Sequence, residues 1–304
     1  MLNILIIQSV LPSVFLFVFG LGIGSFLNVV VLRYQVNQRL FDFKIIGGRS
    51  YCPFCQKKLS WYELIPLASF LIQKGRCRSC GQKISWQYPL VELATGLAFA
   101  FIPNYLYKFY GVATTLLANQ TIAWYYLLLV IWILAALALI LLSVIDFRLS
   151  IIPDQINLFL GLLGIASIFI KDLFDKFGLL EGSFLKNYAL FFGLRDNIWL
   201  NHLFAAFLAA AIFGAIIFLS RGRGMGMGDL KLGTALGLLL GWPDILLALI
   251  LAFVIGGIFG AALILTRKKT MKSSIPFGPF IVAGVFLAIF FGHQILEWYL
   301  HLLN

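Results

Sequence analysis

The stretch IAWYYLLLVIWILAALALILLSVID, from Ile122 to Asp146, decides the fold of this chain. No Asp, Glu, Lys or Arg occurs in it before its last residue. About 20 such residues in a helix cross the ~30 Å hydrocarbon core of a bilayer. We therefore expect a membrane-spanning helix over 122–145, with the Asp146 carboxylate at its end.

The composition extends this expectation to the whole chain. Of the 304 residues, 62% are hydrophobic and 12% are charged, whereas soluble domains have roughly 25% charged residues. One large water-soluble core is excluded because too few polar helix faces remain to cover it. We predict an all-α polytopic membrane protein in the lipid bilayer, with about eight transmembrane helices and a small cytoplasmic zinc-binding segment. The helices are expected near 10–32, 88–107, 122–145, 155–171, 200–220, 230–241, 243–266 and 276–300.

Two apolar stretches need interpretation. The stretch 230–266 is too long for one crossing, and Gly241-Trp242-Pro243 interrupts it, so two short helices are expected, with a seven-span chain as the alternative. The first stretch, 11–32, has no basic n-region and no small-residue cleavage site, and it is too long for a signal-peptide core. We expect it to be a retained span.

The distribution of basic residues predicts the orientation. Alternate connections place 18 of the 23 Lys and Arg residues on one side, ten of them in 33–87. The richer side is expected to be cytoplasmic, which puts both termini outside. The connection 171–199 is the weakest part of this argument, because its four basic residues are balanced by four acidic ones. The same rule accounts for the net charge of +11, so no nucleic-acid partner is expected.

We divide the chain into a first transmembrane span (1–32), a cytoplasmic four-cysteine segment (33–87) and a transmembrane part (88–304). No internal repeat is expected.

All four cysteines lie in the middle segment, as Cys52-Pro53-Phe54-Cys55 and Cys77-Arg78-Ser79-Cys80. Two such pairs can direct four thiolates at one tetrahedral ion, as in zinc ribbons. Two disulfides, or thiols without a partner, are the alternative, and the reducing cytoplasm disfavours disulfides. We expect a structural zinc, because four protein ligands leave no open position.

Three carboxylates stand at the cytoplasmic ends of spans: Asp146, Asp154 and Asp229. Charged groups at membrane depth indicate function, but aspartate at a helix N-terminus is also a common cap. Asp154 directly follows a proline, and we favour the cap there. Asp146 is expected at a helix C-terminus, where the dipole disfavours an anion, so we favour a function for it.

Asp229 ends a run in which every second residue from Gly222 to Gly228 is glycine. Such a run lets another backbone approach closely, so it could hold an extended peptide, although a flexible turn between helices is the alternative. Two close aspartates share a proton and can hydrolyse a peptide bond by general acid–base catalysis. The three histidines, His202, His293 and His301, are expected at the outer side.

With these features identified, the sequence resembles the type IV prepilin peptidases, bifunctional leader peptidases and N-methyltransferases of bacterial pilus and type II secretion systems, which are GxGD-type membrane aspartic proteases. Four motifs carry the resemblance in order: GLGIGSFLNVVVLR (20–33), the cysteine pairs with LSWYELIP (59–66) and ISWQYPLVE (84–92), Asp146 with Ile152-Pro153-Asp154, and MGMGDLK (225–231). One departure is Gln35, where the family often has proline.

The resemblance implies roles for residues at matching positions. Asp146 and Asp229 would be the catalytic pair, and the supporting motif residues would be Asp154, Gly226, Gly228 and Lys231. The substrate would be a prepilin or pseudopilin, cut after its basic leader at the cytoplasmic face of the bacterial inner membrane. The new N-terminus would then be methylated with S-adenosylmethionine.

The methyl-donor site is expected in 33–87, and its candidates are Glu63, Gly75 and Arg76, although a surface carboxylate and a solvated basic turn explain them equally well. A protease without methyl transfer is one alternative to the whole interpretation. An ion-coupled transporter is another, disfavoured because both aspartates are expected at one membrane face whereas transport sites lie near the midplane.

Overall fold

The computed structural model describes residues 2–36, 38, 40, 47–114, 120–175, 183–186, 188–189, 197–267 and 275–303. The chain divides into two compact units, 1–107 and 108–304. The first unit contains α1 (Leu2–Arg33), the short 3-10 helix η1 (Trp61–Leu64), α3 (Ala68–Ile72) and most of α4 (Gln87–Thr114). Helix α4 extends past residue 107, so its last residues belong to the second unit.

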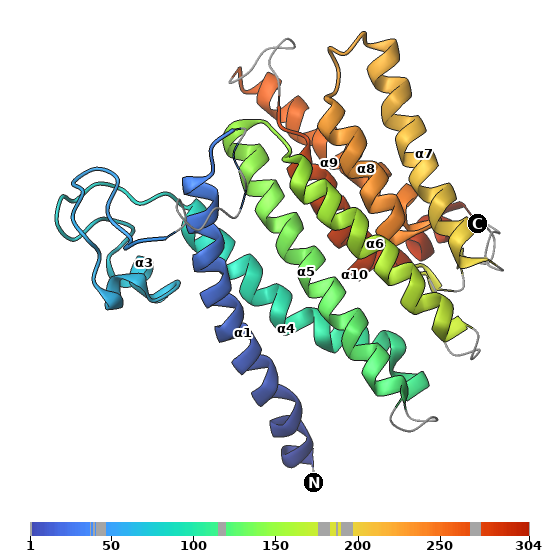
Figure 1. Cartoon of the computed structure of the whole chain (residues 1–304), viewed down its shortest axis with the longest axis horizontal. Coiled ribbons are helices and arrows are strands. Elements are labelled where there is room, and N and C mark those ends of the chain that lie inside the picture. The colour runs from blue at the N-terminus through green and yellow to red at the C-terminus, as the bar shows by residue number, and fades with distance from the viewer. Residues whose placement is uncertain are drawn as a thin grey trace. The chain divides into compact units, whose positions relative to one another are not determined.

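The second unit is a helical bundle. It contains α5 (Gln120–Leu149), α6 (Asp154–Asp175), α7 (Ile198–Leu219), α8 (Met227–Leu240), α9 (Asp244–Leu265) and α10 (Gly278–Leu303). Helix α8 packs against α6 and α7, and α10 packs against α5 and α9 (Figure 1). All eight expected long helices are present, so the predicted all-helical membrane fold is confirmed.

Seven of these helices are long and apolar enough to cross a membrane. Helix α8 is the exception, because its 14 residues extend over only ~21 Å. The end of α8 nevertheless reaches the beginning of α7, since His202 Nδ1 lies 2.8 Å from the Leu238 carbonyl oxygen. The preceding turn stays near the end of α7, where Gly224 N–H donates to Ser220 Oγ at 3.0 Å. Segment 224–240 thus returns the chain along α7.

The reversal between α8 and α9 occurs at Gly241-Trp242-Pro243, as the sequence predicts. Gly241 has a φ of +82°, and a Cβ atom there would lie 2.7 Å from Asn201 Oδ1. The Asn201 side chain holds the turn on both sides, because it accepts from Trp242 N–H and donates to the Trp242 carbonyl, each at 2.8 Å. Glycine is therefore required here by both conformation and space.

Glycines also explain how α1 packs on α4 within the first unit. A Cβ atom on Gly20 would lie 2.8 Å from the Thr95 carbonyl oxygen, and one on Gly24 would lie 2.7 Å from Glu92 Cα and collide with the Thr95 hydroxyl. Gly22, on another face, has nothing within 4 Å. Two small residues four positions apart let membrane helices approach closely. The GLGIG sequence at 20–24 is thus a helix-packing motif.

A buried polar cluster lies in the second unit, far along α6 from Asp154. The Asp244 carboxylate accepts from Ser183 Oγ at 2.8 Å and from Phe184 N–H at 3.1 Å. Lys171 is 3% exposed and interacts electrostatically with Asp244. The sequence analysis did not single out these residues, because no local pattern indicates that 171, 183 and 244 meet.

Candidate active site and metal site

Asp146 lies in the last turn of α5 and is 4% exposed. Its Oδ2 atom accepts a hydrogen bond from the backbone N–H of Gly278, the first residue of α10, at 2.8 Å. The N–H groups of a first helical turn are free and carry partial positive charge. The N-terminus of α10 therefore stabilises an anion that the C-terminus of α5 disfavours.

Asp229 lies in the first turn of α8 and is 9% exposed. Its Oδ2 atom accepts from the Gly226 N–H at 3.1 Å, so the side chain closes the glycine-containing turn onto the helix. Gly228 lies against Ile152, because a Cβ atom on Gly228 would be 3.1 Å from Ile152 Cβ. Asp229 thus combines a capping hydrogen bond with a position beside the segment that follows α5.

The two aspartates belong to the same end of the bundle. The connection from α5 to α6 links Asp146 to Ile152, and Ile152 touches the turn that carries Asp229. The charges of the two carboxylates interact. Two largely buried carboxylates at one end of a bundle are candidates for sharing one proton.

Asp154 has a different environment from the other two. It is the first residue of α6, as expected, and both of its carboxylate oxygens accept from Lys231 Nζ, at 2.8 and 2.9 Å. The pair is exposed, with 70% of the Asp154 side chain and 47% of the Lys231 side chain accessible. It joins the beginning of α6 to α8, at a position two residues after Asp229. Asp154 and Lys231 therefore connect the two segments that meet at Ile152 and Gly228.

The cysteine segment contains an internal repeat, contrary to the expectation from the sequence. The pattern C-x-x-C-x-x-K-[L/I]-S-W occurs at 52–61 and again at 77–86. In each copy the first cysteine N–H bonds the carbonyl five residues later, at Lys57 and Gln82, at 3.0 and 2.9 Å. In each copy a left-handed residue follows the second cysteine, Gln56 at φ 58° and Gly81 at φ 70°. We call these two turns the first and second knuckle.

The two knuckles bring the four thiols together. The Sγ atoms of Cys52, Cys55, Cys77 and Cys80 all lie within 4.8 Å of one another, and those of Cys52 and Cys80 are 3.9 Å apart. Tetrahedral zinc with Zn–S bonds of about 2.3 Å places its sulfur atoms ~3.8 Å apart. Backbone N–H groups of Cys80 and Ser79 lower the pKa of the Cys77 thiol to about 7, whereas burial and the neighbouring thiols raise the pKa of the Cys80 thiol to about 11. The four residues fit a zinc ion.

The three methyl-donor candidates occupy two places in this segment, Glu63 in η1 and the adjacent Gly75 and Arg76 before the second knuckle. Glu63 Oε2 accepts from the Ser60 N–H at 2.8 Å and so closes η1. Gly75, at φ +67°, forms the turn after α3 and lies against the Phe70 ring. Arg76 pairs through its backbone with Lys83 across the second knuckle. The Arg78 guanidinium lies 5.2 Å from the centre of the Tyr62 ring, which links the second knuckle to η1.

Gly278 is the site residue that the sequence analysis missed. A Cβ atom at this position would lie 2.6 Å from Asp146 Oδ2, so a larger residue would require the carboxylate to shift. The sequence signal is present as Ile275-Pro276-Phe277-Gly278-Pro279, a glycine between prolines at the start of a helix. Its meaning depends on the contact with Asp146, 132 positions earlier.

Comparisons with known proteins cover most of the chain. Residues 18–106 match the bacterial peptidase A24 N-terminal domain, and residues 132–261 match the type IV leader peptidase family. No solved structure matches the chain.

Three similar proteins are each named prepilin leader peptidase/N-methyltransferase. That of Aeromonas salmonicida (strain A449) is 34% identical, over 93% of this chain and 92% of its own. That of Bacillus subtilis (strain 168) is 32% identical, over 94% and 96%, and that of Pseudomonas aeruginosa is 29% identical, over 92% and 91%. The resemblance seen in the four sequence motifs is confirmed, and this multi-pass membrane chain belongs to the type IV leader peptidase family.

Proposed function

We propose that this protein hydrolyses a peptide bond with Asp146 and Asp229 as its catalytic pair. The observation that carries the proposal is the burial of two carboxylates, from α5 and α8, whose charges interact at one end of the bundle. Each carboxylate accepts one backbone N–H, from Gly278 and Gly226 respectively. One oxygen of each therefore remains for water or for the substrate.

The chemistry follows from a shared proton. The ionised carboxylate takes a proton from water as the water oxygen bonds to the scissile carbonyl carbon. The protonated carboxylate gives its proton to the carbonyl oxygen, which produces a tetrahedral diol. The C–N bond then breaks, and the leaving nitrogen takes a proton from the pair. No covalent enzyme intermediate is formed.

The substrate is proposed from the relatives, whose names include prepilin leader peptidase. A prepilin or pseudopilin would present its basic leader at the cytoplasmic face of the bacterial inner membrane, where the distribution of Lys and Arg puts both aspartates. Both termini would then be periplasmic. Gly222, where a Cβ atom would have nothing within 4 Å, is the glycine of 222–228 that is proposed to face an extended peptide backbone.

Cleavage of a prepilin peptide by the purified protein tests this proposal. Asp146→Asn and Asp229→Asn, made separately, should each abolish cleavage while the protein remains folded. Glu297→Gln is a matched control, because Glu297 lies on α10 ~28 Å along the helix from Gly278. Near-normal turnover in either aspartate variant would contradict the pair.

We also propose that the protein methylates the new N-terminus with S-adenosylmethionine, which supplies the methyl group. The N-methyltransferase in the relatives' names supports this activity. The proposed site is the cysteine segment, with Glu63, Gly75 and Arg76 as candidates. Labelled S-adenosylmethionine added to the cleavage reaction should label the mature peptide. Cleavage without labelling of the peptide would indicate a protease that has no methyltransferase activity.

Zinc is proposed as the ion held by Cys52, Cys55, Cys77 and Cys80, where it would link the two knuckles. Protein purified without chelators should contain about one zinc per chain. Cys52→Ser should lower the zinc content and the methyl transfer. Protein that retains full methyl transfer after its zinc is removed would contradict a structural role for zinc.

A further inference from the structure

Residues 61–72 of the cysteine segment expose large apolar side chains. Trp61 is 77% exposed, Leu71 71% and Ile72 70%. Tyr62, Leu64 and Ile65 are also exposed. Single exposed apolar residues are ordinary on soluble surfaces, but a contiguous group of this kind indicates an interaction surface.

A hydrogen bond ties this stretch to a membrane-spanning helix. The Leu67 N–H, at the beginning of α3, donates to Glu92 Oε2 at 2.8 Å. Glu92 is 7% exposed and lies five residues into α4, which is ~7 Å from the start of the helix. This hydrogen bond therefore contacts α4 within the helix and not at its first residue. Both of its partners belong to the first unit.

The depth of Glu92 in the bilayer follows from the length of the membrane span that carries it. The span Gln87–Tyr110 has 24 residues, or ~36 Å, and so exceeds the ~30 Å hydrocarbon core by ~3 Å at each end. Glu92 is then close to the boundary between headgroups and acyl chains. Helix α3, whose Leu71 and Ile72 are exposed, is held at the same boundary.

The repeat supplies a second exposed tryptophan beside the same span. Trp86, the counterpart of Trp61, immediately precedes α4 and is 69% exposed. Its ring lies 5.1 Å from the ring of Phe70 in α3. Tryptophan is enriched at membrane–water interfaces because its ring is apolar and its N–H is polar.

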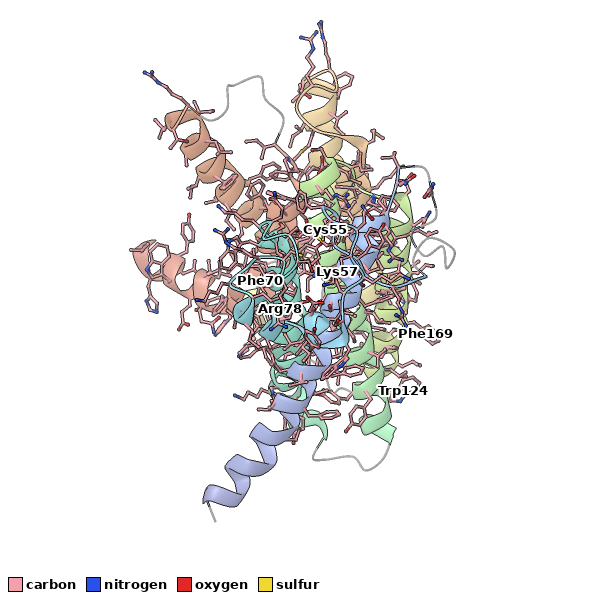
Figure 2. The ribbon with its side chains drawn as sticks, turned by 90° about the vertical axis from the view of Figure 1, so that its left-hand side faces the viewer. Cys55, Lys57, Phe70, Arg78, Trp124 and Phe169 are labelled. Atoms are coloured by element: carbon pink, nitrogen blue, oxygen red, sulfur yellow. The ribbon has the colours of Figure 1, made fainter. Side chains whose placement is uncertain are left out.

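The charge of the segment complements an anionic membrane surface. Glu63 is the only acidic residue in 47–86, and its carboxylate is bonded to the Ser60 N–H. The seven basic residues of this range are Arg49, Lys57, Lys58, Lys74, Arg76, Arg78 and Lys83. Figure 2 shows Lys57, Phe70 and Arg78 together with Cys55 in this segment. Basic residues beside a transmembrane helix are attracted to anionic lipids.

We propose that residues 61–72 form an interfacial anchor that inserts into the adjoining leaflet of the bilayer. Trp61, Leu71 and Ile72 contact the upper acyl chains, and the basic residues of the knuckles contact anionic phospholipid headgroups. The anchor lays the metal-binding knuckles on the membrane surface.

A photo-crosslinking amino acid, p-benzoylphenylalanine, tests the anchor in the full-length protein. It is placed at Leu71, at Ile72 or, as the control, at Gln82, an exposed residue of the second knuckle. Each variant is reconstituted in nanodiscs that contain phosphatidylglycerol, irradiated and analysed by mass spectrometry. A monodisperse peak in size-exclusion chromatography identifies the variants that are folded, and the two anchor positions provide independent readings.

The anchor predicts lipid adducts at Leu71 and Ile72 in about tenfold greater yield than at Gln82. Nanodiscs of phosphatidylcholine alone should lower the yield at Leu71 by about fivefold or more. Equal yields at anchor and control positions, or crosslinks to protein in place of lipid, would overturn the anchor. A yield that does not change without phosphatidylglycerol would overturn its electrostatic part.

Discussion

The backbone N–H of Gly278 donates a hydrogen bond to Asp146 Oδ2 at 2.8 Å, and a Cβ atom at position 278 would lie 2.6 Å from the same oxygen. The contact joins the beginning of α10 to the end of α5. It fixes one carboxylate oxygen of Asp146 and, on the proposed mechanism, leaves the other for catalysis. Gly278 is thus a positioning residue.

Gly278→Ala should lower kcat for prepilin cleavage by about 100-fold, the effect of displacing a catalytic group by ~1 Å. The added methyl group would lie 2.6 Å from Asp146 Oδ2 and force the carboxylate away. Gly257→Ala is the matched control, because a Cβ atom on that α9 glycine has nothing within 4 Å. Steady-state kinetics would contradict the role of Gly278 if both variants lost activity equally.

The ion pair between Asp154 and Lys231 should matter less than the catalytic pair. Exposed pairs contribute about 0.2–1 kcal/mol, so Asp154→Asn should lower kcat/KM by less than about tenfold. Exchange of the two charges, by Asp154→Lys with Lys231→Asp, should recover part of the loss. Abolished cleavage in Asp154→Asn would instead assign Asp154 to the chemistry.

Gly24→Ala should destabilise the first unit, because its methyl group would enter the contact between α1 and α4. Overpacking of this kind costs about 1–3 kcal/mol. Gly22→Ala provides the control two residues away, where nothing lies within 4 Å. The midpoint temperature of thermal unfolding in detergent should be lower for Gly24→Ala only. Equal midpoints for the two variants would contradict this contact between α1 and α4.

Asp244→Ala should destabilise the second unit by about 1–3 kcal/mol, the usual effect of leaving buried hydrogen-bond donors without their acceptor. Lys171 would be left buried without its counter-charge, and Ser183 would lose its acceptor. Adding Lys171→Met to Asp244→Ala should restore much of the lost stability. Urea unfolding of the single and double variants measures this, and a double variant that is no more stable than Asp244→Ala would contradict the pairing.

Local patterns in the sequence predicted the helices well. The predicted helix 243–266 is found at 244–265, and the break at Gly241-Trp242-Pro243 is correct. Helix α1 begins earlier than predicted, at Leu2, since the first residues are also apolar. The length of an apolar stretch and the positions of glycine and proline are local signals. They determine the helices because a bilayer requires helices of a fixed length in which every backbone hydrogen bond is made.

The tertiary contacts could not be predicted in the same way. Asp146 and Asp229 were identified from their positions in the sequence, but the partner of Asp146 is a backbone N–H, which has no signature of its own. The place of Asp154 at the start of a helix was predictable because it follows Pro153, but its bond to Lys231 spans 77 positions and has no local signal. The repeat at 52–61 and 77–86 was visible in the sequence and was missed. The equivalent hydrogen bonds of the two knuckles made it clear.

The central claim is that Asp146 and Asp229 act as one catalytic unit, and the most direct test is the rate of prepilin cleavage in the two single asparagine variants and the double variant. Residues that act as a unit have non-additive effects. Each single variant should lose about 10⁴-fold or more, and the double variant should lose no more than either single variant. Substantial cleavage by either single variant, or losses that multiply in the double variant, would contradict the pair.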